Sequence, residues 1–279
     1  MKNHKKLSTL ILSFFVLISS FTTSFAEMSD KSLETLKNLD TTFKKNMYNI
    51  SDYDTKVGNK WELNVSPEIV KEEKVAMKFL QGVYAVVPFF NAMSVSAVGN
   101  KYTISLENLS SYENKKVIEI AKKWVEESIK PDMTNLEKIK ALHDKIIKET
   151  EYDQSNREEA HSPGAAAIEK KAVCDGYSRM FSIMLAIIDI PVIQVTSNTM
   201  DHAFNLVYLD GRWYLVDVTY DDPLTQGKDI VRYNYFMIDP TTSLRHKYDT
   251  SDKGMTLEEY IALGNYIYKD EIAKTKKVA

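Results

Sequence analysis

The sequence predicts an α+β fold, because helical patterns come first along the chain and strand patterns follow. Residues 111–170 carry apolar side chains mostly at helical spacing, whereas residues 191–220 contain short alternating segments that are typical of strands. Tight-turn signals join those segments, so we expect helices packed on an antiparallel sheet rather than a doubly wound parallel sheet. The 279 residues suffice for one large domain, or for a core domain with a smaller companion.

The first 26 residues have the features of a secretory signal peptide. Three lysines precede an apolar run over residues 7–21, and Ala26 stands just before Glu27. The run is short and rich in serine for a membrane span, so a cleaved signal is favoured and an uncleaved anchor is the alternative. We therefore expect a protein that is secreted or associated with the cell surface, with no membrane span after signal cleavage.

The charge of the chain argues against nucleic acid as a partner. Residues 1–26 hold three lysines and no acid, so the remainder has 33 basic and 39 acidic residues, a formal charge of −6. Nucleic acids and anionic surfaces call for clustered positive charge. The nine glycines form no phosphate-binding or dinucleotide-binding pattern, and one cysteine without a spaced histidine pair does not match a zinc site. We expect no cofactor and no metal.

Residues 27–110 are expected to form an N-terminal α/β extension or companion domain that carries no chemical motif. The elements predicted there are a helix over residues 30–48, a strand over 61–65, a helix over 67–80 and two strands within 88–106 that turn at Gly99-Asn100.

Residues 111–248 are expected to form the core domain. A helix over residues 112–129 stops before Pro131, and the next begins at Thr134 with Glu137 three residues on, the pattern of a capping box. The later predicted elements are a short alanine-rich helix over 164–170, a helix that starts at Cys174, and strands over 191–196, 202–209, 212–220 and 233–238. A C-terminal helical tail, residues 249–279, is expected to contain a helix over 257–263.

Cys174 is the only cysteine in the sequence, so it cannot form a disulfide within the chain. A lone thiol in an exported protein is open to oxidation, and chance retention of a buried cysteine is the alternative explanation. Its position favours chemistry, because it opens a predicted helix whose N–H groups stabilise a thiolate and can donate to an oxyanion. Asp175 and Gly176 follow directly and keep that first turn short and polar.

A predicted hairpin brings a histidine and an aspartate to one face of the sheet. Asp210-Gly211 between two alternating strands is a strong signal for a two-residue turn, so the residues that flank it face each other. His202 and Asp217 then become diagonal neighbours, about 7 Å apart at the backbone. An aspartate there orients and stabilises an imidazole, as the third member of a catalytic triad does. Cys174, His202 and Asp217 are therefore the predicted catalytic residues.

Three segments resemble the bacterial transglutaminase-like family: residues 172–178 (AVCDGYS), 202–205 (HAFN) and 210–223 (DGRWYLVDVTYDDP). Residues 138–153 also resemble the helix that leads into the core of that family, and the resemblance covers about residues 115–240. It implies a papain-like core in which Cys174 is the nucleophile, His202 the base and Asp217 the orienting acid.

Three positions depart from the family's pattern. Phe204 and Tyr220 stand where the family often has Trp, and Asp175 stands where Glu is common. All three keep the chemical character of the position, so they leave the triad whole and bear only on the shape of the substrate cleft.

The resemblance implies an exported cysteine acyltransferase or hydrolase that acts on peptide or glutamine-type amides through a thioester. An amine acceptor gives crosslinking and water gives hydrolysis, and the sequence leaves these two outcomes open. The expected partner is a protein or peptide substrate, with cell-wall or surface proteins as targets. Two alternatives are a non-catalytic binding module at the cell envelope and a structural surface protein whose function lies in residues 27–110.

Other polar residues are weaker candidates. His143 lies on the apolar face of its predicted helix, which favours a core or hydrogen-bonded histidine. His161 stands in a loop that could line the cleft. Asp221 and Asp222, which precede Pro223, are expected to cap the strand and shape a turn, and no spaced ligand loop for calcium is present there.

Overall fold

The protein has an α+β fold with antiparallel sheets, as the sequence predicts. A computed structural model describes residues 30–48, 60–65, 67, 73–90, 92–107, 110–155, 157–197, 199–223, 230–242 and 254–275. The predicted signal segment, residues 1–26, lies outside the described residues. No helix within the described segments is long and apolar enough to cross a membrane.

The central sheet consists of β6 (Val192–Ser197), β7 (His202–Leu209) and β8 (Arg212–Val216), in the order β6-β7-β8. The turn between β7 and β8 has φ angles of 47° at Asp210 and 94° at Gly211, so both residues are left-handed as a two-residue hairpin requires. Leu209 pairs with Arg212, which confirms the predicted register. All of β7 is buried, because helices cover both faces of the sheet.

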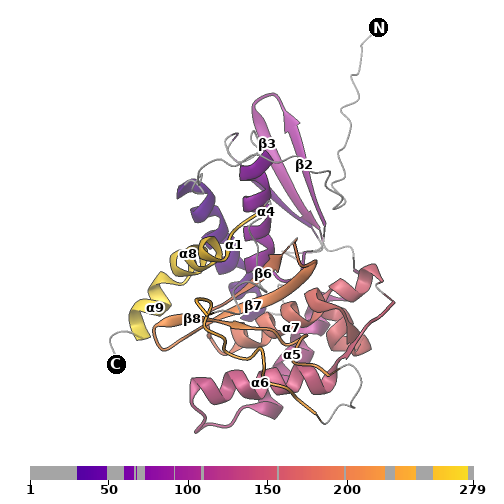
Figure 1. Ribbon diagram of the computed structural model, residues 1–279. Helices are drawn as coiled ribbons and strands as arrows, with labels where there is room; N and C mark the ends of the chain where they lie inside the picture. The colour runs from indigo at the N-terminus through magenta and orange to yellow at the C-terminus, as the bar shows by residue number, and fades with distance from the viewer. Residues whose placement is uncertain are drawn as a thin grey trace.

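One face of this sheet is covered by α7 (Cys174–Ile187), which packs along β6 and β7. The helices α5 (Asn114–Ser128) and α6 (Asn135–Glu149) pack against α7 and lie below it in Figure 1. The predicted capping box of α6 is confirmed: the Thr134 hydroxyl accepts from the Glu137 backbone, and the Thr134 N–H donates to the Glu137 carboxylate at 2.8 Å. This stack of helices fixes where α7, and hence Cys174, begins.

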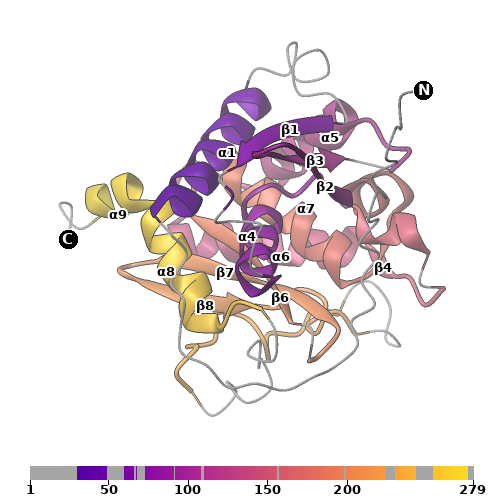
Figure 2. The ribbon, with the colours of Figure 1, turned by 90° about the horizontal axis from the view of Figure 1, so that it is seen from above.

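The N-terminal part contributes α1 (Asp30–Tyr48), β1 (Lys60–Val65), α4 (Glu73–Val86), β2 (Ala92–Val98) and β3 (Lys101–Glu107). Its three strands form a separate antiparallel sheet in the order β1-β3-β2, seen from above in Figure 2. The helix predicted to end at residue 80 continues to Val86, because Val83 and Val86 remain on its buried face. Pro88, two residues later, is incompatible with a longer helix.

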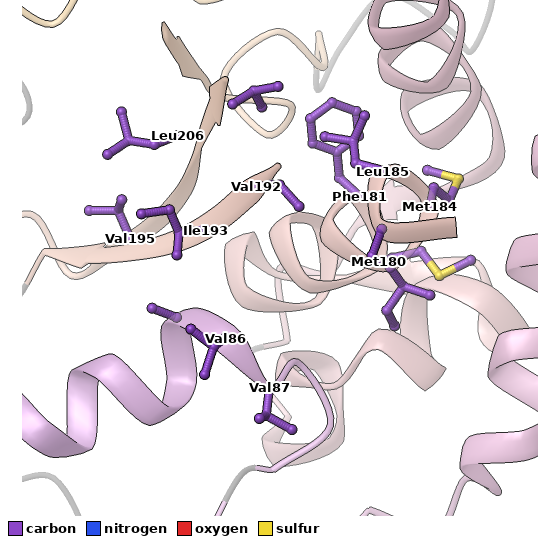
Figure 3. Packing of buried hydrophobic residues seen from close by; sticks show 14 of the residues in the cluster. Val86, Val87, Met180, Phe181, Met184, Leu185, Val192, Ile193, Val195 and Leu206 are labelled. Carbon is purple, nitrogen blue, oxygen red and sulfur yellow. The ribbon is translucent and has the colours of Figure 1, made fainter. Parts of the chain in front are cut away.

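The other face of the central sheet is covered by α4 together with α8 (Leu257–Ile267), which α9 (Lys269–Thr275) follows. Figure 3 shows Val86 and Val87 near Val195 of β6 and Met180 of α7, and all four belong to one buried hydrophobic cluster. A buried ion pair between Lys78 of α4 and Glu259 of α8 joins these two helices. Residues 73–90 are thus packed into the same core that supports Cys174.

Two strand predictions are wrong: one strand ends earlier than predicted, and the other does not form. The strand predicted to end at residue 220 stops at Val216, because the chain turns where the Tyr220 N–H donates to the Asp217 carboxylate at 3.0 Å. Residues 233–238 form no strand: Ile238 makes one isolated bridge to Leu215, and Met237 has a left-handed φ of 54° that breaks an extended run.

The connection between α6 and α7 contains short elements that differ from the prediction. It holds β4 (Glu151–Tyr152), a 3₁₀-helix (Glu158–His161), a π-helix (Ala165–Glu169) at the predicted alanine-rich helix, and β5 (Lys171–Ala172). The strands β4 and β5 pair in parallel, an interaction that two-residue strands give no pattern to predict.

Candidate active site

Cys174 is the first residue of α7 and is 8% exposed. Val173 precedes it as an extended N-cap residue that makes no side-chain capping hydrogen bond within the described structure. The Val173 side chain thus leaves the N–H groups of the first turn uncapped, and such a helix start is an environment that favours a thiolate or an oxyanion.

Gly176 allows a loop to pass directly over this helix start. A Cβ at this position would lie 2.6 Å from the carbonyl oxygen of Ala160 and 2.9 Å from that of Ser162. The Val173 N–H also donates to the Ala160 carbonyl, at 3.0 Å. The backbone of the loop and the first turn of α7 are thus in direct contact, which holds Cys174 in place.

His202, the first residue of β7, connects Cys174 to a buried carboxylate. Its Nε2 lies 2.7 Å from Oδ2 of Asp217, which has no exposed surface. Cys174 lies on the other side of this pair, close enough to His202 to contribute to the raised pKa of the imidazole. The structure therefore brings the three residues predicted from the sequence together as a thiol, an imidazole and a carboxylate in series.

The protonated form of His202 is strongly favoured. Burial by itself lowers the pKa of His202, but hydrogen bonds to Asp217 and Cys174 and the charges of both outweigh it and raise that pKa from 6.5 to about 10. At neutral pH the ring is therefore an imidazolium, the state that stabilises a neighbouring thiolate.

Aromatic rings enclose the imidazole. The Tyr220 ring stacks on His202 with 4.2 Å between centroids and 12° between planes, and Phe204 stacks at 6.3 Å. Tyr220 remains 39% exposed, so it covers the His202–Asp217 pair from the solvent side. Tyr152 of β4 is nearby: burial raises its pKa, and the charges of Cys174 and Asp201 raise it further. The sequence analysis did not predict Tyr152 as a site residue, because a two-residue strand has no recognisable sequence pattern.

Three hydrogen bonds join α7 to the hairpin and to the turn that follows it. The Asn205 amide of β7 donates to the Ser178 carbonyl at 3.1 Å and to the Ser182 hydroxyl at 2.8 Å, both in α7. The Tyr177 hydroxyl donates to the Asp222 carboxylate at 2.6 Å. Asn205 and Tyr177 thus tie the helix that carries Cys174 to the elements that carry His202 and Asp217.

Asp175, next to the thiol residue, is the acceptor of a second histidine. Its Oδ2 lies 2.8 Å from Nδ1 of His161, and its Oδ1 accepts from the Gln194 amide at 3.1 Å. Burial alone would raise the pKa of Asp175, but the hydrogen bond to His161 and the charge of Arg179 lower it. The same hydrogen bond is the largest cause of the raised pKa of His161. His161, the last residue of the 3₁₀-helix rather than a loop residue, therefore lies beside the start of α7.

His143 is buried and hydrogen-bonded, as its apolar helix face predicts. Within the described residues, no hydrogen bond or ring contact joins it to Cys174. Its Nε2 lies 3.1 Å from Oδ2 of Asp221. Asp221 and Asp222 both take part in the turn after β8, which agrees with the turn predicted there. No group of three or more potential metal-ligating His, Cys, Asp or Glu residues occurs in the described segments.

The fold and this site define an α+β protein with a thiol–imidazole–carboxylate series. Residues 122–218 match the Transglutaminase-like superfamily. Kyphoscoliosis peptidase from Mus musculus and from Homo sapiens is 32% identical over 130 residues, which cover 38% of this chain and 20% of each relative. The chain thus spans about a fifth of the length of these curated relatives.

A solved structure described as a crystal structure of a TGase is also similar, with a TM-score of 0.36 and 15% identity over 69% of this chain and 58% of that one. The family match confirms the resemblance found in the sequence. Residues 122–218, which contain Cys174, His202 and Asp217, are therefore transglutaminase-like.

Proposed function

We propose that the protein is an exported cysteine enzyme that transfers or hydrolyses the acyl group of peptide or glutamine-type amides. The observation that carries the proposal is the His202 imidazole, which lies 2.7 Å from the fully buried Asp217 carboxylate and has its pKa raised by that carboxylate and by Cys174. A fixed imidazolium beside a helix-start thiol is the arrangement that activates a cysteine nucleophile.

In the first half of the reaction, the Cys174 thiolate attacks the amide carbonyl carbon. The carbonyl oxygen becomes an oxyanion, which the N–H groups of the first turn of α7 are oriented to stabilise. The carbon–nitrogen bond then breaks, His202 gives its proton to the leaving nitrogen, and an amine or ammonia departs. A thioester on Cys174 and a neutral His202 remain.

In the second half, an amine or water attacks the thioester. His202 takes a proton from the attacking group, the carbon–sulfur bond breaks, and the thiolate and the imidazolium are restored. Asp217 holds one orientation of the ring throughout and stabilises its positive charge. Water yields a carboxylic acid and an amine yields a new amide.

The relatives support both acceptors. The two mammalian relatives are named peptidases, which supports water, whereas the name of the matched superfamily refers to transfer, which supports an amine. Export is part of the proposal and is supported by the three lysines and the apolar run over residues 7–21. An exported enzyme of this kind would act on surface or cell-wall proteins and peptides.

Alkylation by iodoacetamide tests the activated thiol directly, because Cys174 is the only cysteine and every label reports that residue. We expect residues 27–279 to react rapidly and with little pH dependence from pH 6 to 9. His202→Ala should instead follow an ordinary thiol, whose rate rises with ionisation near pH 8.5, about the reference value. Cys174→Ala contains no cysteine and gives the background labelling.

Substrate panels then separate the two acceptors. Release of ammonia or new peptide termini from glutamine-containing peptides, with and without an added primary amine, distinguishes hydrolysis from transfer. Slow alkylation with an ordinary thiol profile that His202→Ala leaves unchanged would contradict the enzyme and favour the non-catalytic binding module.

A further inference from the structure

His143 of α6 is a fully buried histidine with a carboxylate at each ring nitrogen. Its Nδ1 lies 3.1 Å from Oδ1 of Asp144, and its Nε2 lies 3.1 Å from Oδ2 of Asp221. Ionised carboxylates only accept hydrogen bonds, so both ring nitrogens must carry a proton to satisfy both contacts. Burial lowers the pKa of His143, but the bonds to Asp144 and Asp221 outweigh it and raise that pKa overall.

Neighbouring side chains hold this imidazolium in one orientation. The Tyr233 ring stacks on it with 5.5 Å between centroids, and the Phe236 ring meets it edge-on at 4.9 Å. On the α6 side, Asp144 also accepts from the Tyr233 hydroxyl at 2.9 Å and from Lys140 at 2.8 Å. Three donors therefore hydrogen-bond the Asp144 carboxylate, and His143 is one of them.

Besides His143, Asp221 contacts the turn that carries Asp217. Its side-chain Oδ1 accepts from the Tyr235 N–H at 3.0 Å, and its carbonyl accepts from the Arg232 N–H at 3.1 Å. The Asp221 N–H donates to the Asp217 carbonyl at 3.2 Å, and the Asp217 N–H donates to the Tyr235 carbonyl at 3.0 Å. The backbone on both sides of the Asp217 carboxylate is thus linked to Asp221, and Asp221 is linked to His143.

The connection from His143 through Asp221 to Asp217 matters because β8 ends just before Asp217. Ladder pairing between β7 and β8 stops at Val216, one residue before Asp217. The sheet therefore does not fix the Asp217 backbone by itself, and the position of its carboxylate depends on the turn. A catalytic group misplaced by about 1 Å commonly loses on the order of 100-fold in rate.

We propose that His143 is a positioning residue that anchors, through Asp221, the turn that holds the Asp217 carboxylate against His202. Within the described part of the chain, the contacts of His143 are with Asp144, Asp221, Tyr233 and Phe236 rather than with Cys174 or His202, so it acts on the thiol through this turn. The proposal deepens the proposed function and rests on it for its effect on turnover. Its effect on the His202–Asp217 hydrogen bond and on the reactivity of Cys174 can be measured without any substrate.

Two matched variants test the proposal, because each replaces one carboxylate beside His143 by an amide of the same shape. In Asp221→Asn, we expect the alkylation rate of Cys174 at pH 7 to fall by about 10-fold or more, since the turn loses its charged anchor. In Asp144→Asn, the rate should stay within about twofold of wild type, because the amide oxygen still accepts from Lys140 and Tyr233 on the α6 side.

Variants of His143 provide the second comparison. His143→Phe keeps a planar ring and removes both donors, so it should behave like Asp221→Asn. His143→Gln retains an amide donor toward Asp221 and should recover part of the rate. The ring ¹⁵N resonances of His202 should shift toward those of an unpaired imidazole in Asp221→Asn and His143→Phe but not in Asp144→Asn.

Equal losses in Asp221→Asn and Asp144→Asn, in proportion to their loss of thermal stability, would overturn the proposal and leave His143 as a structural ion cluster. Unchanged His202 resonances in Asp221→Asn would overturn it as well. If instead only Asp221→Asn and His143→Phe lose thiol reactivity while no protein processes an amide substrate, the positioning role stands and the proposed enzymatic function fails.

Discussion

Asp217 Oδ2 lies 2.7 Å from His202 Nε2, and Asp217 Oδ1 accepts the Tyr220 N–H at 3.0 Å, so each carboxylate oxygen has a fixed donor. The carboxylate has no exposed surface and is 15 residues from His202 in the sequence. A carboxylate bonded in this way cannot rotate without losing both contacts. The orientation of the His202 ring is therefore set by Asp217.

Replacing Asp217 by Asn should remove most of the turnover. The amide no longer stabilises the imidazolium, so we expect the pKa of His202 to fall from about 10 toward 6.5 and kcat to drop by on the order of 10³-fold or more. Histidine NMR titration and steady-state kinetics measure the two effects. Asp210→Asn, the same chemical change at the turn of the same hairpin, should leave both unchanged, and equal losses in the two variants would contradict this role for Asp217.

The raised pKa of His202 predicts a stability that decreases with rising pH. Burial opposes the charge, yet the bonds to Asp217 and Cys174 raise the folded pKa from 6.5 to about 10, so the folded state binds the proton more tightly than the unfolded chain. This contribution is fully present below pH 6.5 and is lost as pH rises toward 10. Urea unfolding of wild type and His202→Phe should therefore give a difference in unfolding free energy that shrinks across this window. A difference that grows with pH would show that the sign is wrong.

Tyr220 should affect turnover more than stability. Its ring covers the imidazole at 4.2 Å but remains 39% exposed, so Tyr220→Ala should cost less stability than removing a fully buried aromatic ring. Water then reaches the His202–Asp217 bond, and we expect kcat to fall about tenfold, or ~1.4 kcal/mol of barrier, with a small change in Tm. Tyr220→Phe and Tyr220→Trp retain a stacked ring and should keep most of the activity. An Ala variant as active as the Phe variant would rule out a shielding role.

Gly176→Ala should destabilise the protein and displace Cys174 together. The added methyl would lie 2.6 Å from the Ala160 carbonyl oxygen and 2.9 Å from that of Ser162, and backbone atoms cannot move aside cheaply. We expect a loss of about 1–3 kcal/mol in unfolding free energy and slower alkylation of Cys174.

Gly82→Ala is the control for that change. Its nearest clash, at 2.6 Å, is with the flexible end of the Leu36 side chain, and Ala favours the helix. It should cost less stability than Gly176→Ala and leave alkylation unchanged. If Gly82→Ala slows alkylation as much, crowding at Gly176 is not the cause.

The site was predictable from the sequence because its three residues sit on strong local signals. Cys174 opens a helix, and the Asp210-Gly211 turn fixes the register that brings His202 near Asp217. Their catalytic roles stay a prediction until Cys174 is assayed. The supporting residues Gln194 and Asn205 were not recognised, because a polar residue within a strand pattern does not reveal the helix it will bond.

Some elements could be predicted from the sequence because their signals are local. Helix periodicity, the Thr134 capping box and the two-residue turn each depend on neighbours a few residues away, so they predicted the α+β class and the hairpin register. The end of β8 and the contacts that hold Asp217, in contrast, follow from long-range packing. Both depend on hydrogen bonds that Asp221 accepts from His143, 78 residues away, and from Tyr235, 14 residues away. Such contacts exist only after α6, the hairpin and the following loop have packed together, and no periodic pattern in the chain encodes them.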